Sequence, residues 1–75
     1  MKSKQAYRIK MDPRKLRMLL FDRGMTQKTL SEISGVSRPT VVKIFGGGTC
    51  SEESGRKICE ALRVDINEYA TFNRF

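Results

Sequence analysis

Two basic side chains, Arg38 and Lys43, lie five positions apart in the stretch GVSRPTVVKIFGGG, residues 35–48. An arginine can donate two hydrogen bonds to N7 and O6 of guanine, and a lysine can reach a guanine or a phosphate. Pro39 and Val42 are apolar and could touch thymine methyl groups. Alternatively, Val42 is an ordinary surface residue or covers a flank of the core. The residue types in this stretch therefore indicate a segment that recognises base pairs in duplex DNA.

A helix from about Arg38 to Phe45 would place these residues on one side. Successive helical residues are about 100° apart, so Val41, Ile44 and Phe45 fall on the inner side. Pro39 is tolerated in the first turn, where N–H groups have no intrahelical partner. We expect the Ser37 hydroxyl to cap the Thr40 N–H and a left-handed Gly46 or Gly47 to end the helix. Base-reading residues would then be Arg38, Pro39, Val42 and Lys43.

Phosphate contacts are expected from the ends of helices. Gln27 opens the preceding helix, where free N–H groups favour an anion, and Lys28 lies beside it. The loop after residue 45 is expected to expose backbone N–H groups through Gly47, Gly48 and Thr49. A flexible connection is the alternative reading of the glycines. Such contacts position a protein on DNA without specifying sequence.

Composition supports a polyanionic partner. The 75 residues carry a net charge of +7 and include no histidine. Nucleic acid is the first candidate partner and an anionic membrane surface the second. The alternative is a basic surface that is simply solvated and binds no partner. Without histidine or a paired acidic cluster, we expect no enzyme, no metal site, no cofactor and no small-molecule ligand. No apolar run is long enough for a membrane span and no signal segment is present, so a cytoplasmic protein is expected.

The two cysteines are expected to differ in their surroundings. Cys59 falls in an apolar helical pattern and is expected in the core, whereas Cys50 lies in a polar stretch and is expected to be exposed. A disulfide remains open, although a cytoplasmic location disfavours one.

Capping residues and apolar periodicity predict five helices in one small domain. Asp12 and Gly24 bound the first helix, Thr26 and Gly35 the second, Ser51 begins the fourth and Asp65 the fifth. Leu30 and Ile33 would be buried in the second helix, and Gly55 would weaken the fourth. Residues 7–11 alternate as in a short strand, or form an extended arm, and residues 71–75 could form a strand beside them. Met18 and Phe21 give the first helix a second apolar face, to be covered by this arm, the C-terminus or another subunit.

The segments GMTQKTLSEISGVSRPTVVKIFGGG and KICEALRVDINEY resemble the phage Cro/C1-type (XRE-like) helix-turn-helix DNA-binding repressor family. The resemblance implies an all-α, compact, five-helix lambda-repressor-like domain over residues 13–70, preceded by a basic arm or short strand (1–12) and followed by a tail (71–75). It also implies a homodimer on a DNA operator of two half-sites. By motif position, Gln27 resembles the family's phosphate-contacting glutamine, Thr40 lies near the DNA backbone, and Arg38, Pro39 and Lys43 match base-reading positions.

The chain departs from the family pattern at several positions. Phe45 stands where many members have glutamate, and three glycines replace an asparagine-glycine pair. Glu52 and Gly55 stand where leucine is commoner. Dimerisation is expected through either Met18 and Phe21 or the aromatic residues Tyr69, Phe72 and Phe75.

From the basic charge, the outward residues of the third helix and the family resemblance, we expect a transcriptional repressor. The alternative is a protein-interaction module, such as an antitoxin-like or anti-repressor partner.

Overall fold

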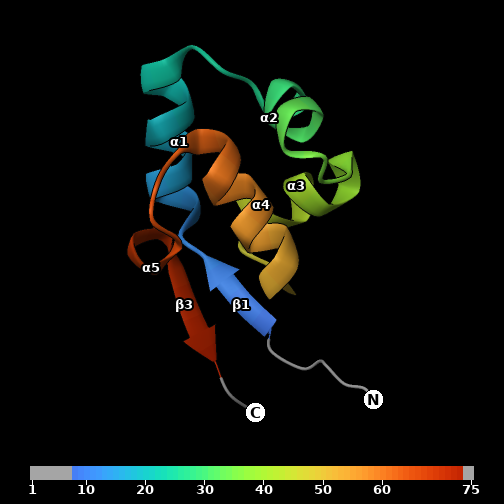
Figure 1. Ribbon diagram of the computed structural model, residues 1–75, viewed down its shortest axis with the longest axis vertical. Coiled ribbons are helices and arrows are strands. Elements are labelled where there is room, and N and C mark those ends of the chain that lie inside the picture. Colours follow the sequence, from blue (N-terminus) through green and yellow to red (C-terminus); the bar gives the residue numbers. More distant parts are fainter. Residues whose placement is uncertain (1–7, 74–75) are drawn as a thin grey trace.

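A computed structural model describes residues 8–73 of the chain. It contains five helices and three short strands (Figure 1). These are β1 (Arg8–Met11), α1 (Pro13–Arg23), α2 (Gln27–Ser34), α3 (Arg38–Phe45), β2 (Thr49–Ser51), α4 (Glu52–Leu62), α5 (Ile66–Tyr69) and β3 (Ala70–Asn73). The prediction of five helices is confirmed, but the all-α prediction is incomplete because the strands form a sheet. The roles expected of Tyr7, Phe75 and the Phe72 side chain lie outside what the structure describes.

Local capping sets where most helices begin. An Asp12 carboxylate oxygen accepts hydrogen bonds from the Arg14 and Lys15 N–H groups at 3.0 and 3.3 Å. The Thr26 and Ser51 hydroxyls, and the Asp65 carboxylate, cap α2, α4 and α5 in the same way. Each of these caps satisfies an N–H group that lacks an intrahelical partner, so the predicted starting points are confirmed.

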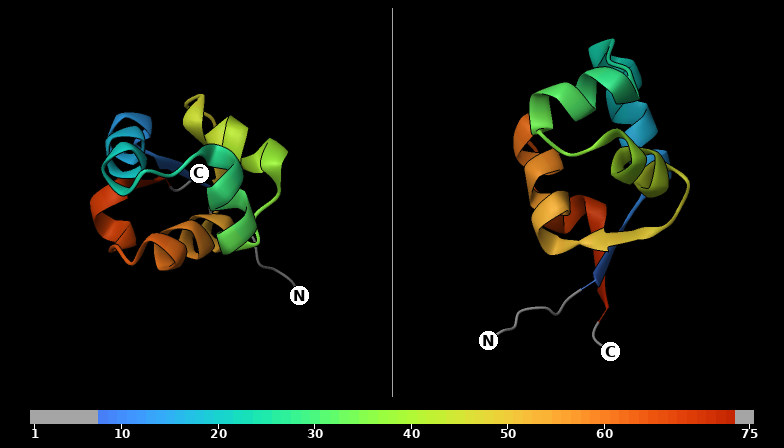
Figure 2. Two further views of the ribbon diagram at one scale, coloured as in Figure 1. Left: turned by 90° about the horizontal axis from the view of Figure 1, so that it is seen from above. Right: turned by 90° about the vertical axis from the view of Figure 1, so that its right-hand side faces the viewer.

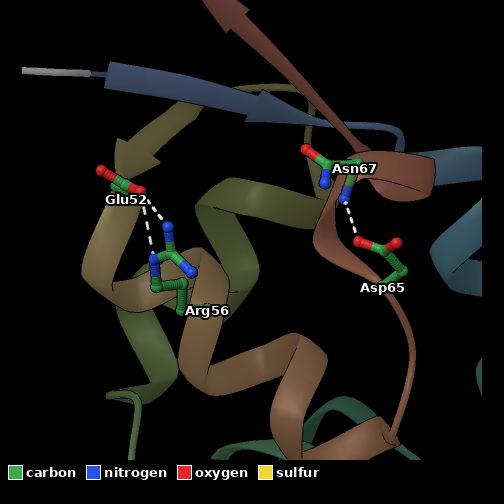
Figure 3. Close-up of polar contacts among 4 residues, drawn as sticks. All are labelled: Glu52, Arg56, Asp65 and Asn67. Carbon is green, nitrogen blue, oxygen red and sulfur yellow. Dashed lines mark hydrogen bonds and ion pairs between the residues drawn. The ribbon is translucent and has the colours of Figure 1, made fainter.

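The first turn of α4 explains one departure from the family pattern. Glu52 lies at the positive end of this helix and accepts hydrogen bonds from Nε and Nη2 of Arg56 at 3.0 and 2.5 Å. Figure 3 shows this ion pair beside the Asp65 cap, whose carboxylate accepts from the Asn67 N–H at 2.9 Å. Glu52 therefore contributes to the start of α4 through charge rather than through apolar packing.

The sheet has the strand order β2-β1-β3, and both pairings are antiparallel. Ile9 of β1 pairs with Cys50 on one side and Phe72 on the other. Of the two alternatives expected for residues 7–11, the structure shows the strand, over Arg8–Met11, and it pairs with a C-terminal strand at Ala70–Asn73 where one was expected over residues 71–75. The strand β2 was not predicted. Cys50 is buried, so its predicted exposure is wrong. The pairing of β2 with β1 turns this central residue of a three-residue strand toward the core.

The core lies between the sheet and the helices. Ile9 and Met11 of β1 are fully buried, while Arg8 and Lys10 are exposed. The helices add their own apolar residues: Leu16, Leu20, Leu30, Val36, Val41, Ile44, Phe45, Ile58, Cys59 and Leu62. Ile33 is 51% exposed, so its predicted burial is wrong. It stands about 60° around the axis of α2 from Leu30, which alone on that helix is buried.

Gly55 allows α4 to approach β1 closely. A Cβ atom at this position would overlap Cδ1 of Ile9. A larger residue here would require the buried Ile9 side chain to move, so the glycine suits the close packing of α4 on β1.

Helix α1 and the helix pair α2–α3 lie toward different sides in the view of Figure 1, and α1 still packs against α3. Figure 1 shows α1 along one margin of the molecule, α4 in the middle, and α2 and α3 along the other margin. The left view of Figure 2 shows the same arrangement from above. The strands β1 and β3 extend past the helices at one end. None of the described helices has the length and apolar character of a membrane span.

Candidate nucleic-acid interface

Two serines hold the turn between α2 and α3. The Ser31 hydroxyl donates to the Val36 carbonyl at 2.6 Å, and the Val36 N–H donates to the Ser34 hydroxyl at 3.1 Å. Gly35 adopts φ +77°, a left-handed conformation that ends α2. Because Val36 is buried, the turn is fixed both by hydrogen bonds and by packing. No role was predicted for the two serines, although the pattern S-x-x-S-G contains both of them.

The two faces of α3 differ as predicted. Val41, Ile44 and Phe45 are buried in the core. The opposite side exposes Arg38, Pro39, Val42 and Lys43, and Val42 is 52% exposed. Val42 therefore does not cover a flank of the core. The structure brings the four expected base-reading residues together on one outward surface.

The start of α3 differs from the predicted cap. The Ser37 hydroxyl donates to the hydroxyl oxygen of Thr40 at 2.9 Å and does not accept from the Thr40 N–H. The predicted cap bond is therefore wrong. Thr40 is half-buried, and its oxygen already receives a hydrogen bond. The Thr40 hydroxyl still carries a proton that it can donate to another acceptor.

The three glycines fold back onto the end of α3. The Gly46 N–H donates to the Val42 and Lys43 carbonyls at 3.0 and 3.1 Å, the Gly47 N–H to Ile44 at 3.1 Å, and the Gly48 N–H to Lys43 at 2.9 Å. The expectation that these N–H groups are exposed for phosphate is therefore wrong. They satisfy carbonyl groups at the helix end, which have no later helical residue to bond.

The local geometry favours glycine at each of the last two positions of the triplet, for a different reason at each. Gly47 adopts φ +91°, which side chains rarely tolerate. A Cβ atom at Gly48 would lie 2.7 Å from Cγ and 3.1 Å from the carbonyl oxygen of Lys43. The expected loop residue Thr49 begins β2, and its hydroxyl accepts from Nη2 of Arg8 at 3.1 Å. The triplet is therefore a tight helix ending that continues directly into the sheet.

Cationic side chains of α1 bind the carboxyl ends of three other helices. Nη2 of Arg17 donates to the carbonyl of Phe45, the last residue of α3, at 2.9 Å. Arg23 donates to the carbonyl of Leu62, the last residue of α4. Nζ of Lys15 donates to the carbonyl of Glu68 in α5 at 3.0 Å. Cations at these ends compensate the helix dipoles, so part of the positive charge serves the fold.

The start of α2 offers the remaining expected contacts. Gln27 is half-buried and Lys28 is exposed, and both lie in the first turn of α2. The Thr26 hydroxyl accepts from the Thr29 N–H at 3.1 Å, so this cap does not occupy the N–H groups of Gln27 and Lys28. Groups at this position favour an anion because of the helix dipole.

Burial perturbs the thiols of the two cysteines, which lie in β2 and α4. Cys50 and Cys59 are both free and buried. Burial raises the pKa of the Cys50 thiol, and the charge of Arg8 partly opposes this effect. Burial also raises the pKa of Cys59, to about 11, with a further contribution from the Asp65 carboxylate. Both thiols are therefore protonated at neutral pH and behave as small core residues.

Comparison with known proteins agrees with the helix-turn-helix geometry. Residues 15–74 match the family model of the Cro/C1-type HTH DNA-binding domain. The chain is also similar to a crystal structure of the transcriptional regulator VanUg, with a TM-score of 0.68 and 28% sequence identity. That match covers 100% of this chain and 97% of the other. No curated protein sequence matches significantly.

Proposed function

The chain belongs to the Cro/C1-type helix-turn-helix DNA-binding family, and we propose that this DNA-binding regulator is a sequence-specific transcriptional repressor acting as a homodimer. It would occupy an operator of two half-sites, with one α3 in each major groove. The similarity to a transcriptional regulator over nearly the whole of both chains supports the regulatory role.

The observation that carries the proposal is the outward face of α3. Arg38, Pro39, Val42 and Lys43 are exposed together, while Val41, Ile44 and Phe45 fix the helix from behind. Arg38 would donate two hydrogen bonds to guanine, and Lys43 would reach guanine or phosphate. Pro39 and Val42 would contact thymine methyl groups. The exposed Val42 supports this proposal because it gives the outward face an apolar group for such a contact.

Phosphate contacts would orient α3 within the groove. Gln27 and Lys28 stand at the positive end of α2, and the Thr40 hydroxyl retains a proton to donate. Gly47 and Gly48 no longer belong to this set, because their N–H groups donate to carbonyls of α3. The Thr49 hydroxyl is engaged by Arg8 and is a weaker candidate. The remaining contacts position the protein and add salt dependence.

The test compares Arg38→Ala and Lys43→Ala with Lys28→Ala. Affinity is measured by fluorescence anisotropy on an operator recovered by selection and on a random duplex, at several salt concentrations. Arg38→Ala should weaken operator binding by about 1–3 kcal/mol, or roughly 5- to 150-fold, with a smaller effect on random DNA. Lys28→Ala should weaken binding to both duplexes alike. It should also lower the slope of log affinity against log salt concentration by about one.

Arg14→Ala is the matched control, because Arg14 is an exposed cation in the first turn of α1 and belongs neither to α3 nor to the first turn of α2. It should change both affinities little. If Arg38→Ala and Lys43→Ala bind both duplexes as the parent does, α3 is not the recognition helix.

A further inference from the structure

The outer side of α1 carries the two most exposed large apolar side chains that the structure describes. Phe21 is 85% and Met18 66% exposed. Beside them is a groove lined by Lys15, Met18, Leu19, Asp22, Glu68 and Tyr69. Met18 projects from α1 on the side opposite the core residues Leu16 and Leu20. Exposed apolar side chains that cluster in this way mark an interaction surface.

The charges along this side are arranged to complement a second copy of themselves. Lys15, Met18, Leu19 and Asp22 follow the spacing i, i+3, i+4, i+7 and so form one stripe on α1. A cation lies at one end, a carboxylate at the other, and apolar residues in the centre. A two-fold axis through that centre reverses the helix direction. It would therefore place Lys15 of each copy opposite Asp22 of the other.

The residues around the stripe favour the approach of a second copy of the chain. Nζ of Lys15 is held by the Glu68 carbonyl at 3.0 Å and lies 6.0 Å from the centroid of the Tyr69 ring. Lys15 is thus positioned at the groove and retains two donors. The groove carries one basic side chain and two acidic ones, Asp22 and Glu68, on a chain of net charge +7. The other cations of α1, Arg14, Arg17 and Arg23, do not line the groove, so the acidic side chains within it are available to Lys15 of a second copy.

We propose that a second copy of this chain docks on α1, forming an antiparallel α1–α1 pair around Met18 and Leu19 with two Lys15–Asp22 ion pairs. This proposal rests on the proposed function for the existence of a homodimer. The surface through which the two copies meet is argued separately, from the residues of α1. Since no residue of α3 lines this groove, the pairing leaves the outward residues of both α3 helices uncovered.

The size of α1 limits the strength of the pair. An 11-residue helix is roughly 16 Å long, and one such contact buries less than the roughly 800 Å² per partner of a standard stable interface. The dimer is therefore weak in free solution and is stabilised when both copies occupy adjacent half-sites. Measurements must extend to high protein concentration.

The test is sedimentation equilibrium of the full chain, without DNA, across a wide range of concentrations. The parent should dimerise. Asp22→Lys and Lys15→Asp each set like charges against each other and should raise the dimer Kd at least tenfold. An equimolar mixture of these two variants should form a heterodimer, because each then supplies the charges that the other lacks. The double variant K15D/D22K should recover dimerisation.

Two further variants keep the test decisive. Met18→Glu changes an exposed position, cannot disturb the core, and should be monomeric because it places two carboxylates at the two-fold centre. Glu60→Lys is the control, since it makes the same charge change as Asp22→Lys on the exposed side of α4. It should leave dimerisation unchanged. Circular dichroism establishes that each variant is folded.

A parent that stays monomeric throughout would overturn the inference. So would a dimer that responds to Met18→Glu and Asp22→Lys no more than to Glu60→Lys. DNA binding is measured separately on a single half-site. Retained half-site binding with no α1 dimer refutes only the contact surface, whereas loss of parental DNA binding refutes the proposed function.

Discussion

Replacing Arg17 with methionine should loosen the attachment of α3, the proposed recognition helix. Nη2 of Arg17 donates to the carbonyl oxygen of Phe45 at 2.9 Å, in a partly buried position. Phe45 is the last residue of α3, so its carbonyl has no later helical N–H to bond. Methionine has a similar reach but neither charge nor donor. Arg17→Met therefore removes this link between α1 and α3 while preserving most apolar contact.

The expected loss of stability follows from the type of bond. A hydrogen bond from a charged donor contributes about 1.5–3 kcal/mol, and a cation at a helix carboxyl end about 0.3–1 kcal/mol. Arg17 is partly exposed to solvent, which screens its charge. We therefore expect a loss of about 1–2 kcal/mol, where each 1 kcal/mol lowers the Tm of a domain this size by about 4–8 °C.

Urea unfolding followed by circular dichroism measures this loss directly. Arg14→Met is the control, because it removes an exposed α1 cation and should change stability by less than about 0.5 kcal/mol. At a temperature where Arg17→Met is folded, its operator affinity should fall while the salt slope stays parental, since Arg17 is not placed at the DNA. The reasoning is refuted if Arg17→Met unfolds at the same urea concentration as Arg14→Met.

Two further predictions concern the core. Gly55→Ala gains about 1 kcal/mol of helix propensity, but the new Cβ would overlap Cδ1 of Ile9. We therefore expect the free energy of unfolding, measured in urea, to fall by about 1–2 kcal/mol. A more stable variant would contradict this packing. The pKa of Cys59 is raised from 9.0 to about 11 on folding, so between these values the unfolded chain releases a proton that the folded chain retains, and stability falls as pH rises. Stability curves over this range should be flatter for Cys59→Ala than for the parent, and identical slopes would show that Cys59 is not the cause.

The helices could be predicted because their signals are local. Asp12, Thr26, Ser51 and Asp65 each accept a hydrogen bond from an N–H group two or three residues later. Such contacts depend only on neighbouring residues, and the sequence contains all of them. The same locality let a rotation of about 100° per residue separate the exposed Val42 from the buried Val41.

The sheet was harder to predict because its contacts are distant in sequence. β2 has three residues, Thr49–Ser51, and no apolar alternation by which to recognise it. It exists because Ile9 pairs with Cys50, which lies 41 positions later. The same pairing buries Cys50, which the polar stretch around it did not suggest. A strand this short is defined by its partner rather than by its own residues.

The glycine triplet shows a similar limit at the candidate site. Local composition correctly predicted the end of α3 and a left-handed glycine there, which is Gly47. It did not reveal that all three N–H groups turn back to carbonyls of α3, or that Gly48 lies against Lys43. Nor did it reveal that Arg17 holds the end of α3 across 28 positions. These contacts follow from the path of the chain in three dimensions.

In vitro selection of bound sequences from a random duplex library tests the central claim, that α3 of this chain reads DNA. The parent should enrich an inverted repeat whose half-sites are centred about one helical turn, or a multiple of it, apart. The same selection with Arg38→Ala should lose the preference at one base pair in each half-site and keep the spacing. Recovery of no enriched motif by the folded parent would contradict the account.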